Sequence, residues 1–128
     1  MSEPTSPVTE DELLAFVRAS ISSVWELELL LLVYRSPERR WTPKEIDREL
    51  RASATVVNSA LRRLRAAELV AESAREQFQY QRGSQRTHEM VHALDIAYRT
   101  NPISVVKVIL GAPDTSLKVF SEAFRFKE

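Results

Sequence analysis

Two closely spaced helix signals restrict the fold of this chain more than any other feature. Thr42-Pro43-Lys44-Glu45 combines a capping threonine, a proline at the first helical position and a glutamate at the third, so we expect a helix to begin here. A three-residue connection, Arg51 to Ser53, leads into a segment whose apolar residues recur at helical spacing: Val57, Ala60, Leu61 and Leu64. The sequence therefore predicts a helix, a short turn and a second helix.

The segment after these helices favours a short β-hairpin. Leu69–Ser73 suits a strand, and Phe78–Arg82 alternates aromatic residues with glutamines, which is the period of a strand. Ahead of the helix pair, Arg39–Trp41 is a candidate for a further short strand. Two helices followed by a hairpin are thus expected within residues 39–82.

Additional helices are predicted on both sides of this unit. Thr9 with Glu12, and Ser23 with Glu26, form capping boxes ahead of apolar segments. After the hairpin we expect a helix from Ser84 to about Arg99, a short helix after Asn101-Pro102, and a last helix after Pro113 that presents Leu117, Phe120 and Phe124. The predicted fold class is mainly α with a small β-hairpin. A disordered tail (1–8) precedes a single domain (9–128) made of N-terminal helices (9–38), the helix pair with its hairpin (39–82) and C-terminal helices (83–128).

Composition excludes several classes of site. The chain of 128 residues is long enough for one domain, and it contains no cysteine, so disulfides, thiolate zinc sites and cysteine nucleophiles are ruled out. Only two glycines are present, which leaves no glycine-rich phosphate loop. The N-terminus lacks the features of a signal peptide, and the apolar run Leu27–Val33 carries Glu28 and is too short to span a membrane. We expect a cytoplasmic protein without membrane contact.

Charge is balanced over the whole chain but not along it. Eighteen basic and eighteen acidic residues give a net charge of zero, which by itself disfavours nucleic acid. Residues 35–65, however, hold nine basic against four acidic side chains, a local charge of +5. This excess falls on the predicted helix pair, where it provides a basic face for a polyanion.

The segment 39–82 resembles the winged helix-turn-helix transcriptional regulators, of the MarR-like and related bacterial families. The residues that carry the resemblance are Ser53, Val57, Leu61, Leu64, Leu69 and Val70. It implies a regulator whose second helix, residues 53–66, enters the major groove of double-stranded DNA while the hairpin, or wing, contacts the backbone or the minor groove. Glu68 departs from the pattern, because these families usually have glycine at the turn between helix and wing. That turn must then be made differently.

The resemblance assigns roles by position on the second helix. Thr55, Ser59 and Arg62 lie opposite its buried edge, with Asn58 and Arg63 beside them. Asn58 would read adenine, Arg62 or Arg63 guanine, and Thr55 a phosphate or a thymine methyl. Arg40, Lys44 and Arg48 are expected at phosphates, and Arg75 in the wing. The predicted DNA-binding residues are Ser53, Thr55, Val56, Asn58, Ser59, Arg62, Arg63, Lys44, Arg48 and Arg75.

Other interpretations of these residues stay open. The arginines also fit a solvated helix face, and the small side chains from Thr55 to Ser59 also fit a surface that packs against another protein. The alternative function is a winged-helix adaptor that binds a protein partner and no DNA. The large apolar residues near the chain ends predict a homodimer through the N- and C-terminal helices, or else one completed monomeric core: Trp25, Leu29, Leu32, Phe120, Phe124 and Phe126.

The segment HEMVH, from His88 to His92, matches the zinc-protease signature. That chemistry needs a third ligand, and because the chain has no further histidine this would be a carboxylate such as Asp95, Asp114 or Glu122. A helical wheel places the two histidines, Asp95 and Arg99 opposite the apolar side, so we expect exposed histidines and an ordinary exposed Asp95–Arg99 ion pair. The prediction is no enzymatic activity, no metal site and no cofactor.

Overall fold

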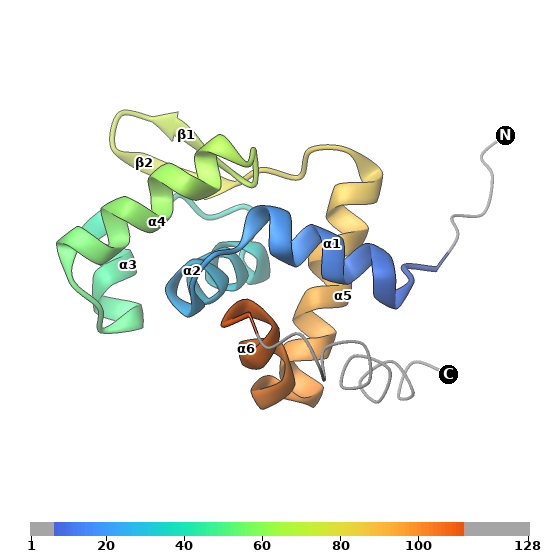
Figure 1. Cartoon of the computed structure of the whole chain (residues 1–128). Helices are drawn as coiled ribbons and strands as arrows, with labels where there is room; N and C mark the ends of the chain where they lie inside the picture. The colour runs from blue at the N-terminus through green and yellow to red at the C-terminus, as the bar shows by residue number, and fades with distance from the viewer. Residues whose placement is uncertain (1–6, 112–128) are drawn as a thin grey trace, which may run out of the picture.

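The computed structural model describes residues 7–111, a mainly helical chain with one two-stranded hairpin. Along the chain the elements are α1 (Glu10–Ser20), α2 (Val24–Arg35), α3 (Pro43–Leu50), α4 (Ala54–Ala66), β1 (Val70–Ala74), β2 (Gln77–Tyr80), α5 (Gln85–Thr100) and α6 (Pro102–Ile109). Figure 1 shows α3, α4 and the hairpin at one end and α1, α5 and α6 at the other. The predicted mixture of helices and a small hairpin is confirmed. The helix expected after Pro113 and residues 1–6 of the expected tail lie outside the described residues.

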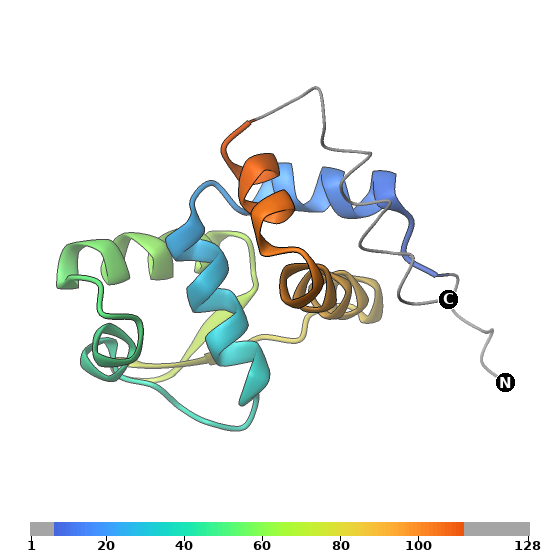
Figure 2. The same ribbon diagram turned by 90° about the horizontal axis from the view of Figure 1, so that it is seen from below.

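Helix α2 is the centre of the core. Its sequence VWELELLLLVYR is apolar nearly all round, and its Leu27, Leu29 and Leu30 are fully buried. Figures 1 and 2 show α2 between α3 and α4 on one side and α5 on the other, which explains why it has no wide polar face. Leu29 and the half-buried Leu32 were candidates for a dimer interface or a monomeric core, and they pack in the core of this chain. Across residues 7–111 no helix, α2 included, is long and apolar enough to cross a membrane.

Side-chain caps begin the helices at the places that the sequence predicts. The hydroxyls of Thr9 and Thr42 each accept a bond from the backbone N–H three residues on. The carboxylates of Glu12 and Glu45 in turn accept from the backbone N–H of Thr9 and Thr42, so both predicted capping boxes are present. The starts of α4, α5 and α6 are capped by Ser53, Ser84 and Asn101. Local bonds thus fix where the helices of the predicted pair begin.

The hairpin is joined to the segment that precedes α3. Strands β1 and β2 are antiparallel, with Val70 opposite Tyr80. Trp41 forms an isolated bridge to Phe78, with the backbone N–H of each residue 2.7 Å from the carbonyl oxygen of the other. The strand expected at Arg39–Trp41 is therefore reduced to one residue, but that residue fixes the hairpin beside α3.

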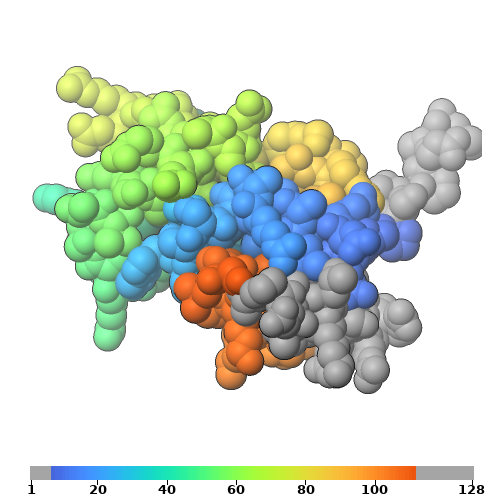
Figure 3. All heavy atoms as spheres, in the orientation of Figure 1, coloured from blue at the N-terminus to red at the C-terminus, as the bar shows by residue number. Residues whose placement is uncertain are grey.

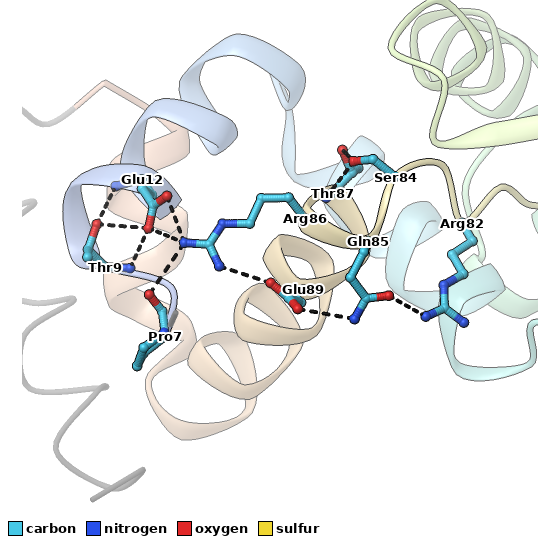
Figure 4. Close-up of polar contacts among 9 residues, drawn as sticks. All are labelled: Pro7, Thr9, Glu12, Arg82, Ser84, Gln85, Arg86, Thr87 and Glu89. Carbon is cyan, nitrogen blue, oxygen red and sulfur yellow. Dashed lines mark hydrogen bonds and ion pairs between the residues drawn. The ribbon is translucent and has the colours of Figure 1, made fainter. Parts of the chain in front are cut away.

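The N-terminal helix is tied to α5 by a polar network, shown in Figure 4. Arg86 on α5 donates to both carboxylate oxygens of Glu12, at 2.6 and 2.8 Å, and to Glu89 at 2.9 Å. It also donates to the carbonyl oxygen of Pro7 at 3.4 Å, and Val8 packs partly buried against the core. The last two residues of the expected tail thus belong to the packed structure.

Candidate nucleic-acid interface

The turn between α3 and α4 is set by one left-handed residue and one cap. Arg51 has a φ of 56°, and its N–H donates to the Asp47 carbonyl at 2.7 Å, which ends α3. The Ser53 hydroxyl accepts from the N–H of Val56 at 3.2 Å and begins α4. Ser53, a predicted DNA-binding residue, therefore uses its oxygen as a cap and retains its hydroxyl hydrogen as a donor.

Helix α4 has one face anchored in the core and one face at the surface. The anchored face consists of Val57, Ala60, Leu61 and Leu64, none more than 3% exposed. Of the predicted base-reading positions, Thr55, Asn58 and Arg62 are exposed, while Val56 and Ser59 are half-buried at its margin. In the space-filling view of Figure 3, atoms of α3 and α4 form the surface at one end of the molecule. Within residues 7–111, the outer face of α4 is accessible.

Several cations near this face form no ion pair with a carboxylate of residues 7–111. Among the described residues, no ion pair involves Arg40, Lys44, Arg48 or Arg62, and all four side chains are exposed. Arg39 differs, since its guanidinium stacks 3.5 Å from the Trp41 ring centroid. The unpaired cations lie on α4, on α3 and just before α3, where they are available to phosphates.

Arg63 differs from its neighbour Arg62 because it forms an ion pair within the fold. Its Nε lies 3.5 Å from Oε2 of Glu26, a carboxylate whose side chain is only 5% exposed at the start of α2. The capping box predicted for Ser23 and Glu26 is half wrong: Ser23 caps α2, but the Glu26 carboxylate accepts from the N–H and the hydroxyl of Ser22, both at 2.8 Å. A buried carboxylate needs such partners, and Arg63 adds one from α4. The pair joins α4 to the central helix.

The tip of the hairpin carries a cation, Arg75, that pairs with no described carboxylate. Arg75 is exposed and forms no ion pair among residues 7–111, whereas the nearby Glu72 lies 3.3 Å from Arg65 of α4. The backbone N–H of Glu76 also donates to the Glu72 carboxylate, at 2.8 Å. Glu72 is thus partly neutralised, and Arg75 is the cation that the hairpin tip offers to a partner.

The turn from α4 to β1 corrects one expectation. A turn made differently was expected because Glu68 replaces glycine, but Glu68 itself adopts the left-handed conformation that favours glycine, with a φ of 62°. The Leu69 N–H donates to the Leu64 carbonyl at 2.9 Å, which closes the helix end. The turn therefore has the left-handed backbone geometry that favours glycine, and the side chain of Glu68 makes this geometry strained.

The two histidines of HEMVH bind tyrosines from other elements. Nδ1 of His88 lies 2.8 Å from the Tyr80 hydroxyl, and Nδ1 of His92 lies 2.7 Å from the Tyr34 hydroxyl. Burial and then the neighbouring Tyr34 raise the pKa of Tyr80 to about 12. Burial and then the charge of Asp95 also raise the pKa of Tyr34. His92 is exposed as expected, but His88 is half-buried, and both rings are oriented by tyrosines.

The predicted ion pair of Asp95 and Arg99 is present, but the predicted exposure of Asp95 is wrong. The Asp95 side chain is 6% exposed and binds two arginines, Arg35 through Oδ1 at 2.7 Å and Arg99 through Oδ2 at 3.2 Å. The helical wheel of α5 could not show this, because Arg35 comes from the last turn of α2 and covers the carboxylate. Both carboxylate oxygens are thus engaged.

Comparison with known proteins finds no matching family model, no matching curated protein and no matching solved structure.

Proposed function

We propose that this chain is a winged-helix protein that binds double-stranded DNA through α4 and acts as a cytoplasmic transcriptional regulator without catalysis. The observation that carries the proposal is the outer face of α4, where exposed Thr55, Asn58 and Arg62 lie on a helix whose opposite face is anchored in the core. The order of α3, α4 and hairpin, with the Trp41 bridge, supports the winged-helix assignment.

Contacts are assigned by charge and exposure. Asn58 reads adenine and Arg62 reads guanine, since an amide and a guanidinium bind these bases with two hydrogen bonds each. Lys44, Arg48 and Arg40 neutralise phosphates, and the hairpin brings Arg75 to the backbone or the minor groove. The buried face of α4 fixes the orientation in which the helix meets the groove, and Arg63 adds a weak contact to α2 through Glu26.

The regulator acts as a homodimer formed by helices at the chain ends. Ile103, in the first turn of α6, and Leu110, the residue directly after its end, are 68% and 74% exposed. Two such exposed apolar side chains on one face of a short helix are unusual. A two-fold pair of chains would present two copies of α4 to half-sites roughly 34 Å apart. Light scattering coupled to size-exclusion chromatography tests this, and a monomeric mass at micromolar concentration rejects the dimer.

DNA binding is tested by the salt dependence of duplex affinity, measured by fluorescence anisotropy. If Arg40, Lys44, Arg48, Arg62 and Arg75 all contact phosphate or displace counterions, the slope of log K against log salt is roughly −4.5 per chain. Lys44→Ala makes it shallower by about 0.9, whereas Arg62→Ala costs about 1–3 kcal/mol and relaxes base preference. Arg99→Ala is the matched control and changes neither, because this arginine is 63% exposed on α5, away from α4 and from the exposed face of α6. Absence of salt-dependent binding, or an equal effect of Arg99→Ala, contradicts the proposal.

A second candidate function is a protein-binding adaptor, favoured by one surface on α2 and α3. Trp25 is 40% exposed and lines an open pocket of about 330 Å³ with the acidic residues Glu28 and Glu49. A basic, apolar peptide segment would suit this surface. In that case the chain binds no duplex DNA, and Trp25→Ala abolishes retention of the partner protein while Arg62→Ala does not.

A further inference from the structure

The histidines of HEMVH lie on one side of α5, one helical turn apart, and each ring is held by a tyrosine from a different element. Tyr34, on α2, contacts Nδ1 of His92 at 2.7 Å. Tyr80, on β2, contacts Nδ1 of His88 at 2.8 Å. With both Nδ1 atoms engaged, Nε2 is the nitrogen that each ring has left for another partner.

Both histidines line the same open pocket, of about 420 Å³, between the last turn of α2 and α5. Tyr34 packs against both rings, with its ring centroid 5.9 Å from that of His88 and 6.4 Å from that of His92. Tyr34 also meets Tyr80 edge to face at 5.4 Å. The rings are therefore confined by one another as well as by their hydrogen bonds, yet the pocket remains open to solvent.

We propose that His88 and His92 bind a divalent transition-metal ion through their Nε2 atoms, with Tyr34 and Tyr80 as positioning residues. Imidazole pairs one turn apart on a helix suit zinc, nickel and copper, whereas magnesium and calcium prefer oxygen ligands. A hydrogen bond at the second ring nitrogen is the usual means by which proteins fix the tautomer and orientation of a metal-ligating histidine. Metal binding selects the tautomer in which Nδ1–H donates to the tyrosine oxygen, and the tyrosine hydroxyl then donates to water.

The remaining metal ligands come from solution. Within residues 7–111 there is no group of three or more histidine, aspartate or glutamate side chains placed to hold a metal. Asp95, which lines the same pocket, has both oxygens engaged by Arg35 and Arg99. These two arginines leave one net positive charge beside Asp95, so an anion such as chloride or a small carboxylate is favoured as an additional ligand over a third protein group.

This site is not that of a protease. The glutamate of the motif, Glu89, has Oε1 2.9 Å from Arg86 and Oε2 3.1 Å from the side-chain amide of Gln85. Both oxygens of the residue that would act as general base are thus bound to neighbours on α5. The site is independent of the proposed DNA-binding face on α4, and a bound ion would link α2, β2 and α5 through the two His–Tyr pairs.

Isothermal titration of the full chain with zinc chloride tests the proposal. We expect one saturable site of micromolar affinity in the wild type and its loss in His92→Ala. Tyr34→Phe should weaken zinc affinity by about tenfold, because loss of an orienting partner typically weakens metal sites by 10–100-fold. Tyr98→Phe is the matched control, since the Tyr98 hydroxyl donates to Glu28 and not to a histidine. The zinc affinity of Tyr98→Phe should equal that of the wild type.

Thermal unfolding in the absence and presence of zinc supplies a second readout. Zinc should raise the Tm of the wild type and not that of His92→Ala, since a ligand that binds the folded state stabilises it. His92 is exposed and the Tyr34 hydroxyl group is small, so both variants should match the wild-type Tm without metal. Absence of saturable binding, or binding that survives His92→Ala, overturns the site. Unchanged affinity in Tyr34→Phe overturns the positioning role and leaves an ordinary surface histidine pair.

Discussion

The buried carboxylate of Glu26 should stabilise the fold mainly through Ser22 and only weakly through Arg63. Glu26 accepts two hydrogen bonds from Ser22, both at 2.8 Å, and lies 3.5 Å from Arg63. Bonds to a charged acceptor contribute roughly 1.5–3 kcal/mol each. Because Ser22 is exposed, water replaces the missing carboxylate as its hydrogen-bond acceptor in Glu26→Ala and offsets part of the lost free energy. We therefore expect Glu26→Ala to lower the free energy of unfolding by about 2–3 kcal/mol.

Two further variants separate the contributions. Glu26→Gln keeps one acceptor oxygen for Ser22 but removes the charge, so a loss of about 1 kcal/mol is expected. Arg63 is 61% exposed, and removing it from an ion pair with so much solvent contact should cost less than about 1 kcal/mol. The Arg63→Ala variant keeps the Glu26 carboxylate and both of its hydrogen bonds from Ser22, whereas Glu26→Ala removes the carboxylate itself.

Urea unfolding followed by circular dichroism measures these differences as shifts of the midpoint at constant m value. The expected order of destabilisation is Glu26→Ala, then Glu26→Gln, then Arg63→Ala. A loss in Arg63→Ala equal to that in Glu26→Ala would show that the ion pair, rather than the Ser22 bonds, holds the carboxylate. An unchanged midpoint in Glu26→Ala would refute the stabilising role altogether.

Three other predictions concern the fold. The hydrogen bond that Arg86 donates to Glu12, together with the one donated by the Thr9 backbone N–H, lowers the pKa of Glu12 from its ordinary 4.5 to about 2. A lowered carboxyl pKa contributes stability that is present above pH 4.5 and is lost as the pH falls towards 2. Thermal melts across that range should show this loss in the wild type and a smaller one in Arg86→Ala; identical acid profiles would contradict the pairing. Leu64→Ala should cost about 2–5 kcal/mol in urea unfolding, while Leu110→Ala, at a site 74% exposed, should change little; equal losses would contradict the assigned core. Because Glu68 has a positive φ, Glu68→Gly should be more stable than Glu68→Ala by about 0.5–1 kcal/mol, and the opposite order would refute the strain assigned to that turn.

Local signals allowed most of the architecture to be predicted from the sequence. Capping threonines, the proline after Thr42 and apolar spacing act within one or two turns, and the helices begin where those signals lie. The alternation from Phe78 to Tyr80 located β2 in the same way. The outer face of α4 followed from the same periodicity, since fixing four buried positions on a helix also fixes those that face outward.

Contacts between distant segments could not be predicted. Tyr34 and His92 are 58 residues apart, and Arg35 and Asp95 are 60 apart, so no local spacing links them. The wheel of α5 placed Asp95 in solvent because it contained no information on the end of α2. Arg62 and Arg63 are likewise equivalent in the sequence, and only the packing of α4 against α2 gives Arg63 a buried carboxylate partner.

The most direct test of the DNA-binding claim is site-specific photo-crosslinking to duplex DNA at Thr55, on the outer face of α4, compared with Lys107, on exposed α6. With a photoreactive residue at position 55, we expect crosslinks to bases, and with the same residue at position 107 we expect none above background. Crosslinks of equal yield at both positions, or DNA binding without any crosslink at position 55, would contradict the placement of α4 in the groove.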